Sequence, residues 1–414
     1  MPNPSKIHPK LARHLASERA RAFGEPHLRI IVKYRSADVL MDVVSGLESS
    51  SNAYRFLAAR AYGATAAAIN VLSERDDVEM VWFDEPVHTM LDVSVPLLEA
   101  PLVWQAGFTG KGIKVAVVDT GIDPNHPDFG NRVAQMKDFT GEGPGDNNGH
   151  GTHVAGIIGG SGAASNGKYK GVAPDCLFFT AKVLRGNGSG STSEVMAGIE
   201  WAVQQGAQVI NLSLGSDGAC DGSDALSTLC DAAVSRGVVM CIAAGNAGPD
   251  ASTVGSPGCA KTVITVGATN KSDRVADFSS RGPTSDQRVK PDICFPGVSI
   301  VACRGNGTAM GTPLNSFYTS ASGTSMATPH ATGACALLLE AKPGLAPQQI
   351  KDLLASTAKD LQAEPNTGGK GRAQVYLAYQ GAVEVTPEPP QPPQPPTPPG
   401  NGCLPMLKSA LTGR

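Results

Sequence analysis

Five apolar stretches of strand length recur between residues 113 and 269, and helical segments are predicted between them. The stretches are IKVAVVD (113–119), LFFTAKVL (177–184), AQVINLSLG (207–215), GVVMCIAAGN (237–246) and TVITVGAT (262–269). The predicted helices cover 193–205, 224–236, 326–341 and 346–360. Strands that are apolar on both faces and separated by helices are typical of a parallel sheet covered on both sides. The sequence therefore predicts a doubly wound α/β fold for most of the chain.

Composition divides the chain into four segments. Residues 1–26 are polar and basic, which predicts a loose N-terminal arm, and residues 27–91 predict a small α+β domain of ferredoxin-like order. Residues 92–385 hold the predicted α/β domain. The segment 386–414 opens with TPEPPQPPQPPTPPGNG. Such a segment cannot bury a core, so we expect an extended polyproline spacer.

The small domain is predicted to follow a β-α-β-β-α-β order. Five segments of this order can be bounded from the sequence: a strand (27–34), a helix opened by Ser36 (36–47), a strand or helix (54–62), a helix (64–75) and an alternating strand (78–91). A segment of this size gains little stability alone, so we expect it to lean on the larger domain.

Charge and hydropathy exclude several classes of protein. The formal net charge is −3, which gives no electrostatic reason to expect a nucleic-acid or membrane partner. No apolar run approaches the roughly 18 residues that span a bilayer. The basic N-terminus lacks the apolar core and small-residue cleavage site of a secretory signal. We therefore expect a cytoplasmic rather than a secreted protein.

Nine cysteines are present, an odd number. Cys241 and Cys335 lie inside apolar runs, which favours small buried thiols. Spacing alone does not assign disulfide pairs. Pairs that could bridge are Cys220 with Cys230 and Cys294 with Cys303.

Three motifs carry residues suited to catalysis. The stretch VAVVDTG ends an apolar strand in Asp119, and catalytic groups on open α/β sheets collect at the carboxyl ends of strands. The stretch HGTHVAGIIGG opens a helix with His150. A zinc site at His150 and His153 is disfavoured because no HExxH pattern and no nearby acid at ligand spacing accompany them, so His153 is expected to be structural.

The third motif, GTSMATPH, places Ser325 at the start of a helix. The free N–H groups and the positive dipole end of such a start suit a developing oxyanion. Pro329 lacks an N–H, so the carbonyl of Ser325 loses its usual helical partner.

Together these residues predict nucleophilic catalysis. A serine hydroxyl needs a neutral imidazole to remove its proton, and the imidazole needs a carboxylate on its other nitrogen. A fourth motif, AAGNAG, ends a strand in Asn246, whose side-chain amide is suited to donate to the oxyanion.

The order of VAVVDTGID, HGTHVAG, NLSLG, AAGNAGP and SGTSMATPH resembles the subtilisin-like serine proteases, or subtilases. GKYKGVAP and DFSSRGPT (167–174 and 277–284) are most similar to the intracellular type of this family. The resemblance covers roughly 92–360 and implies a serine endopeptidase that needs no cofactor for its chemistry. It implies that Asp119 orients His150, that His150 is the general base, that Ser325 is the nucleophile and that Asn246 stabilises the oxyanion.

The resemblance also implies how protein and peptide substrates bind. GNGSG (186–190) matches the edge strand on one side of the substrate, and SLGS (213–216) matches the other side. Ala247 stands where many relatives have an acid, so we expect large apolar or aromatic P1 residues. The implied substrate-binding residues are Gly188, Ser189, Gly190, Ser213, Leu214, Gly215, Ala244 and Gly245.

Residues 27–91 resemble the inhibitory pro-region of the family, which assists folding and then blocks the cleft. DVSVP (92–96) resembles a mature N-terminus. The resemblance thus implies a self-processing zymogen that is cut between Leu91 and Asp92, with its own pro-domain as an inhibitory partner.

Structural calcium is left open. Asp128 matches a carboxylate that ligates calcium in many relatives, but the partner loop at 160–170 offers few carboxylates.

Two alternatives for function are also left open. One is a selective processing protease, which the subsites rather than the triad would decide. The other is a non-catalytic binding member of the fold, which nothing in the four motifs favours.

Overall fold

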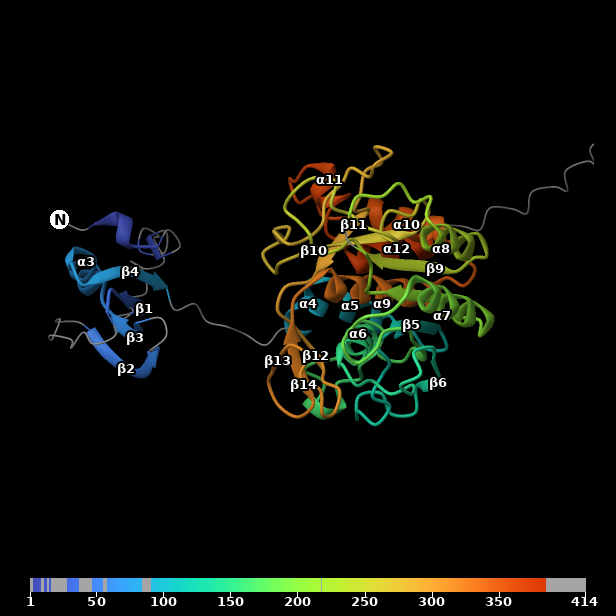
Figure 1. Ribbon diagram of the computed structural model, residues 1–414, viewed down its shortest axis with the longest axis horizontal. Helices are drawn as coiled ribbons and strands as arrows, with labels where there is room; N and C mark the ends of the chain where they lie inside the picture. Colours follow the sequence, from blue (N-terminus) through green and yellow to red (C-terminus); the bar gives the residue numbers. More distant parts are fainter. Residues whose placement is uncertain are drawn as a thin grey trace, which may run out of the picture. The chain divides into compact units, whose positions relative to one another are not determined.

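Seven parallel strands form the main sheet of the computed structural model, which describes residues 3–8, 11–12, 15, 28–36, 47–54, 58–83, 91–216 and 218–384. The strand order is β11-β10-β9-β8-β5-β7-β6, and each neighbouring pair runs parallel. The strands are β5 (Lys114–Asp119), β6 (Val133–Asp138), β7 (Leu177–Lys182), β8 (Val209–Leu212), β9 (Val239–Ala243), β10 (Ile264–Thr269) and β11 (Ile293–Pro296). The predicted doubly wound α/β fold is confirmed (Figure 1).

Helices cover both faces of this sheet because successive strand residues point to opposite sides. In β5, Val115 and Val117 belong to one buried core, while Ala116 and Val118 belong to the other. The first core includes residues of α4 (Leu91–Leu97), α5 (Ala100–Gln105), α6 (His150–Gly159), α9 (Thr324–Ala341), α10 (Pro347–Ser356) and α12 (Val375–Glu384). The second includes residues of α7 (Thr192–Gln204) and α8 (Ala225–Ser235).

The order of the strands reverses beside β5. β7 and β6 lie on one side of it, and β8 to β11 lie on the other in sequence order. In open α/β sheets the crevice at such a point, outside the carboxyl ends of the strands, is where ligands bind. The carboxyl end of β5 is Asp119.

Smaller elements complete this part of the chain. They are the antiparallel strands β12 (Ile300–Cys303), β13 (Thr312–Pro313) and β14 (Tyr318–Ala321), the turn of 3-10 helix η3 (Ala163–Ser165), and the helix α11 (Pro365–Gly368). A further turn of 3-10 helix, η1 (Pro4–Lys6), belongs to the N-terminal unit, Met1–His88. Among the described residues, no helix combines the length and the apolar character that crossing a membrane requires.

The chain divides into two compact units, Met1–His88 and Thr89–Arg414. The first contains an antiparallel sheet of order β2-β3-β1-β4, in which β1 pairs with β3 and β4. Its elements are β1 (Leu28–Tyr34), β2 (Leu47–Tyr54), β3 (Ala59–Ala64), α3 (Ala66–Glu74) and β4 (Val78–Phe83). Thr65 caps α3 by accepting a hydrogen bond from the backbone N–H of Ala68 at 3.2 Å.

Some predictions for the first unit are corrected. Residues 37–46, most of the predicted helix, lie outside the described residues, and Leu47 begins β2 instead of ending a helix. The alternating strand ends at Phe83, residues 84–90 are not described, and Leu91 begins α4. The polyproline segment also lies outside the described residues.

The described part of the N-terminal arm is not loose. Ile7 forms a bridge with Val81, and the backbone N–H of His8 donates to the carbonyl of Val81 at 3.0 Å. Leu11 is fully buried in the core of this unit together with Ile30 and Val81. The polar composition of residues 1–26 concealed the two apolar side chains that pack here.

The cysteine pairing also differs from both pairs that the spacing suggested. Cys220 is bonded to Cys259, with 6.0 Å between their Cα atoms. Cys230, Cys294 and Cys303 are buried free thiols. Cys241 and Cys335 are buried free thiols as predicted, with their sulfur atoms 3.8 Å apart.

Candidate active site

Asp119 is a fully buried carboxylate at the carboxyl end of β5. Its Oδ1 accepts a hydrogen bond from the backbone N–H of Thr120 at 2.7 Å and lies 2.7 Å from Nδ1 of His150. Its Oδ2 has no hydrogen-bond partner among the described residues. A buried negative charge is costly unless donors or a cation oppose it. The carboxylate therefore favours a protonated Nδ1 on His150.

His150 is the first residue of α6 and follows Gly149, which has a φ of 107°. A Cβ atom on Gly149 would lie 2.6 Å from Oγ1 of Thr308, so the entry to α6 requires glycine. The His150 side chain is 21% exposed. Because Asp119 engages Nδ1, Nε2 is the ring nitrogen left to exchange a proton.

The pKa of His150 reflects opposing effects. Removal from water lowers it, but the charge of Asp119 and the hydrogen bond to it raise it, and the charge of Asp146 raises it further. The net result is a pKa above the usual value of 6.5. The site thus stabilises the imidazolium that forms when His150 takes a proton.

Asp146 was not singled out in the sequence, although it stands four residues before His150. Its Oδ1 accepts from Oγ1 of Thr120 at 2.9 Å and from the backbone N–H of Gly149 at 2.7 Å. Its Oδ2 accepts from the N–H and the hydroxyl of Thr152 at 2.9 and 2.6 Å. Asp146 therefore joins the end of β5 to the first turn of α6, which fixes Asp119 relative to His150.

Ser325 is the second residue of α9 and lines a pocket with Asn246. Its hydroxyl donates to the carbonyl of Ser213 at 3.0 Å. Among the residues that the structure describes, no hydrogen bond joins the Ser325 hydroxyl to His150. Catalytic contacts commonly tighten only when substrate is bound. For a proton to pass from the Ser325 hydroxyl to His150, the Ser325 side chain would have to rotate away from the Ser213 carbonyl.

Pro329 lies inside α9, four residues after Ser325. Because proline has no N–H, the Ser325 carbonyl has no partner within the helix. It accepts instead from the hydroxyl of Ser213 at 3.0 Å. Ser213 and Ser325 are thus linked by two hydrogen bonds in opposite directions, which anchors the start of α9 to the segment after β8.

Asn246 follows β9 and is oriented by Thr324. Its Oδ1 accepts from the backbone N–H and the hydroxyl of Thr324 at 2.8 and 3.0 Å. Its Nδ2 has no hydrogen-bond partner within the described part of the chain. The oxygen is therefore occupied, and a donor nitrogen remains beside Ser325.

Two adjoining cavities surround these residues. A groove of about 700 Å³ is lined by His150 and by predicted substrate-binding residues, namely Gly188, Ser189, Gly190, Ser213, Leu214 and Gly215. A pocket of about 180 Å³ is lined by Ser325 and Asn246 together with Leu214, Gly215, Ser216, Ala243, Ala244, Gly245, Gly255, Ser256 and Thr324. No charged side chain lines this pocket among the described residues.

Two details of the predicted substrate walls differ in the structure. The segment at 186–190 is a turn rather than a strand, closed by the N–H of Gly188 bonding to Arg185 and the N–H of Arg185 bonding to Ser189. Ala247 is exposed and is not among the residues that line the pocket. The uncharged pocket therefore comes from the residues inside it and not from Ala247.

Asp128 does not have the surroundings of a calcium ligand. Its Oδ1 accepts from the N–H of Ala164 at 2.9 Å, and its Oδ2 accepts from the hydroxyl of Tyr318 at 2.8 Å. The thiol of Cys303 lies 3.6 Å from the same Oδ2. Calcium requires several oxygen ligands. Here hydrogen-bond donors surround the carboxylate, so these residues do not fit calcium.

His126 completes this buried cluster, and its ligand atom, that of Asp128 and that of Cys303 lie within 4.8 Å of one another. Its Nδ1 accepts from the N–H of Asp128 at 3.1 Å, and its Nε2 lies 2.8 Å from the Phe317 carbonyl. Both ring nitrogens are thus in use, and burial raises the pKa of the Cys303 thiol. The cluster is a hydrogen-bonded network.

His153 has a structural role in the core. Its Nε2 lies 3.2 Å from the carbonyls of Ile300 and Thr319, so this nitrogen is the donor. Burial and the charge of His150 lower the pKa of His153 to about 4. A neutral ring that donates to two carbonyls does not serve as a metal ligand through the same nitrogen.

Comparison with known proteins gives consistent matches. Residues 110–374 match the model of the subtilase family, Peptidase_S8. The chain is 39% identical to the serine protease AprX of Bacillus subtilis (strain 168), covering 74% of this chain and 75% of AprX. It is also 39% identical to subtilisin E of the same organism, covering 79% of this chain and 82% of that protein. A crystal structure of a cold-adapted subtilisin-like serine proteinase matches with a TM-score of 0.54 and 36% identity, covering 64% and 89% of the two chains.

Proposed function

Because the chain belongs to the subtilase family and is a subtilisin-like serine endopeptidase, we propose that Asp119, His150 and Ser325 form its catalytic triad. The observation that carries this proposal is the 2.7 Å contact between Nδ1 of His150 and the buried carboxylate of Asp119, at the strand end beside the reversal of strand order. The chemistry of such a triad uses side chains and water and needs no cofactor.

The first half of the reaction begins when substrate binds and the Ser325 hydroxyl leaves the Ser213 carbonyl. Nε2 of His150 removes the hydroxyl proton, and Oγ attacks the substrate carbonyl carbon. The carbonyl oxygen becomes an oxyanion. Nδ2 of Asn246 and the backbone N–H of Ser325, in the first turn of α9, are the donors suited to stabilise it.

The imidazolium of His150 then gives its proton to the leaving amine, and an acyl group stays on Ser325. Water enters, loses a proton to His150 and releases the acyl group by the reverse sequence. Asp119 keeps its charge throughout and stabilises the imidazolium. The raised pKa of His150 supports this role.

Protein and peptide substrates are proposed to bind as an extended strand in the groove, between Gly188–Gly190 and Ser213–Gly215. The P1 side chain enters the pocket beside Ser325. Its uncharged lining, which includes Leu214, Ala243 and Ala244, supports a preference for large apolar or aromatic P1 residues.

We further propose that the chain is a zymogen whose first unit inhibits the second. The order β2-β3-β1-β4, with β1 antiparallel to both neighbours, is that of the ferredoxin-like domain predicted for this segment. The match to subtilisin E also covers a larger share of the chain than residues 110–374. Both observations support a pro-region.

Kinetics of two single variants test the triad. Ser325→Ala should lower kcat by about six orders of magnitude, His150→Ala by about the same, and the double variant should lose no more; subtilisin itself is the source of this magnitude. Ser356→Ala, at an exposed serine ending α10, is the matched control and should keep full activity. A Ser325→Ala protein that retained a hundredth of the normal rate would refute the assignment.

A further inference from the structure

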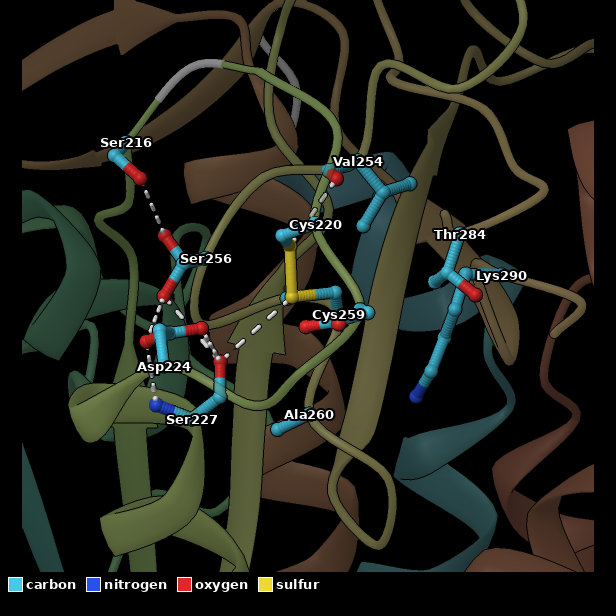
Figure 2. Close-up of a disulfide and its surroundings, with 12 residues drawn as sticks. Ser216, Cys220, Asp224, Ser227, Val254, Ser256, Cys259, Ala260, Thr284 and Lys290 are labelled. Atoms are coloured by element: carbon cyan, nitrogen blue, oxygen red, sulfur yellow. Dashed lines mark hydrogen bonds between the residues drawn. A yellow bond between two sulfur atoms is a disulfide. The ribbon is translucent and has the colours of Figure 1, made fainter. Parts of the chain in front are cut away.

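The Cys220–Cys259 disulfide joins two loops that both line the pocket beside Ser325. The loop after β8 carries Leu214, Gly215, Ser216 and Cys220, and the segment between β9 and β10 carries Gly255, Ser256 and Cys259. Figure 2 shows the disulfide below Val254 and across from the Ser216–Ser256 contact. The covalent link therefore joins the two loops through residues that do not themselves line this pocket.

The walls touch each other through their backbones. The N–H of Ser216 donates to the carbonyl of Ser256 at 2.8 Å. A Cβ atom on Gly255 would lie 1.8 Å from the carbonyl oxygen of Ser216, so only glycine allows this approach. A small shift of either loop would therefore change the width of the pocket.

Polar contacts attach the wall formed by Gly255 and Ser256 to α8 (Figure 2). The hydroxyl of Ser256 donates to Oδ1 of Asp224 at 2.7 Å, and Asp224 caps α8 by accepting from the N–H of Ser227 at 3.0 Å. The hydroxyl of Ser227 lies 3.7 Å from the sulfur of Cys259. These bonds hold Ser256, while the carbonyl of Cys220 accepts a hydrogen bond from the N–H of Ser285 at 3.0 Å.

Few apolar contacts hold the disulfide region. Cys220 and Cys259 pack with Ala244 and Val254 in a small cluster separate from the two large cores. Ala244 also lines the pocket. Outside this cluster, Arg288 donates to the carbonyls of Asp221 and Cys259 at 2.7 and 2.8 Å. The disulfide is thus the covalent link between the walls, and it acts together with the Ser216–Ser256 hydrogen bond and with Arg288, which donates to both walls.

We propose that the Cys220–Cys259 disulfide is a positioning element for substrate specificity, which sets the width of the P1 pocket and can be released by a dithiol. This inference rests on the proposed function of that pocket. Cys220 is partly exposed and lines the groove, while Cys259 is fully buried. A dithiol therefore meets the Cys220 sulfur first.

The release is a two-electron exchange. One thiolate of the dithiol attacks the Cys220 sulfur, the bond between the two cysteine sulfurs breaks, and Cys259 leaves as a thiolate that takes a proton. The second thiolate of the reductant then displaces Cys220, which is also protonated. The enzyme gains two thiols, and the reductant becomes a disulfide.

Steady-state kinetics on peptide anilides with Phe, Leu or Ala at P1 test the proposal. After treatment with dithiothreitol, KM for the Phe and Leu substrates should rise about tenfold, which corresponds to about 1.4 kcal/mol. kcat should change by less than about twofold, because the triad does not contact the disulfide. Reoxidation should restore KM, so wild-type protein alone gives a decisive result.

Two variants complete the design. The double variant Cys220→Ser/Cys259→Ser should behave as the reduced enzyme and should not respond to dithiothreitol. Cys230→Ala removes a buried thiol of α8 that is free in the structure and should leave the response unchanged. The assays are run well below the melting temperature of each form, so that a change in KM reflects the pocket and not partial unfolding.

Unchanged KM and unchanged P1 ranking in the reduced wild-type enzyme would overturn the proposal. So would a fall in kcat that is equal for all substrates with KM constant. Labelling of Ser325 by a fluorophosphonate distinguishes failure of the disulfide proposal from failure of the proposed protease function. If Ser325 is labelled and selectivity does not move, only the role of the disulfide fails. If no form is labelled, the proposed function itself fails.

Discussion

At the scale of single residues, two carboxylates influence the position and the pKa of the His150 imidazole. Asp119 contacts Nδ1 directly, while Asp146 acts through Thr120, Gly149 and Thr152. Both raise the pKa of His150. In the proposed mechanism His150 must be neutral to accept the Ser325 proton, so the onset of activity with pH reports this pKa.

The first prediction concerns that onset. In wild type, kcat/KM should rise with pH through a midpoint above 6.5, because the pKa is raised. Asp146→Asn keeps the shape but removes the charge, so the midpoint should move to lower pH. Asp175→Asn, at an exposed acid before the amino end of β7, is the control and should not move it. A profile that is flat between about pH 5 and 8 would exclude a histidine base.

Asn246 gives a second residue-scale prediction, because Thr324 holds its oxygen and leaves Nδ2 available. Asn246→Ala should cost roughly 3–4 kcal/mol of transition-state stabilisation, the magnitude known for the equivalent donor in subtilisin. The loss should fall on kcat. A rise in KM at constant kcat would instead make Asn246 a substrate-binding residue.

The sequence could indicate which residues meet, but not how they are held. Asp119 and His150 were predicted from motif and position, and the structure places them in contact. The bond between Ser325 and Ser213 could not be predicted, because it depends on the close approach of β8 to α9. Asp146 was visible in the stretch DNNGHGTH, but its hydrogen bonds to Thr120 and Thr152 arise only in the fold.

At the scale of elements, the inner strands of the main sheet were predictable and its two edge strands were not. β5, β8, β9 and β10 are almost wholly apolar and buried. β6, with the sequence VAQMKD, is partly exposed at the sheet edge. Its strand conformation depends on pairing with β7, and such context outweighs intrinsic propensity.

The third prediction concerns the network that joins β14 to Asp128. Tyr318→Phe removes the hydroxyl that donates to Oδ2 of this buried carboxylate, so unfolding free energy should fall by about 1–3 kcal/mol. The loss, measured by chemical denaturation, should be the same with calcium and with a chelator. Tyr376→Phe on α12 is the matched control. A loss that appears only in the presence of calcium would contradict the hydrogen-bonded network.

On the scale of the whole molecule, two units of unequal size share one chain. The core of the first contains few buried apolar residues, whereas two large cores flank the main sheet. A small core gives marginal stability, so a released first unit should be degraded readily. The sequence indicated both units, but it did not reveal that Ile7 and Leu11 belong to the first.

The fourth prediction is self-processing between Leu91 and Asp92. In the structure these residues begin α4, so this turn must unwind to enter the groove as an extended strand. N-terminal sequencing of active wild-type enzyme should give a start at Asp92 or within a residue or two, and the Ser325→Ala chain should remain intact. A start near Met1, or one inside β5, would contradict the proposed processing.

The central claim is that Ser325 is a nucleophile activated by His150 and Asp119. The most direct measurement is reaction with a fluorophosphonate probe followed by mass mapping of the labelled peptide. We expect one adduct, on Ser325, with labelling abolished in Ser325→Ala and strongly slowed in His150→Ala. An adduct on another residue, or an unlabelled Ser325 in a preparation that cleaves peptides, would contradict the claim.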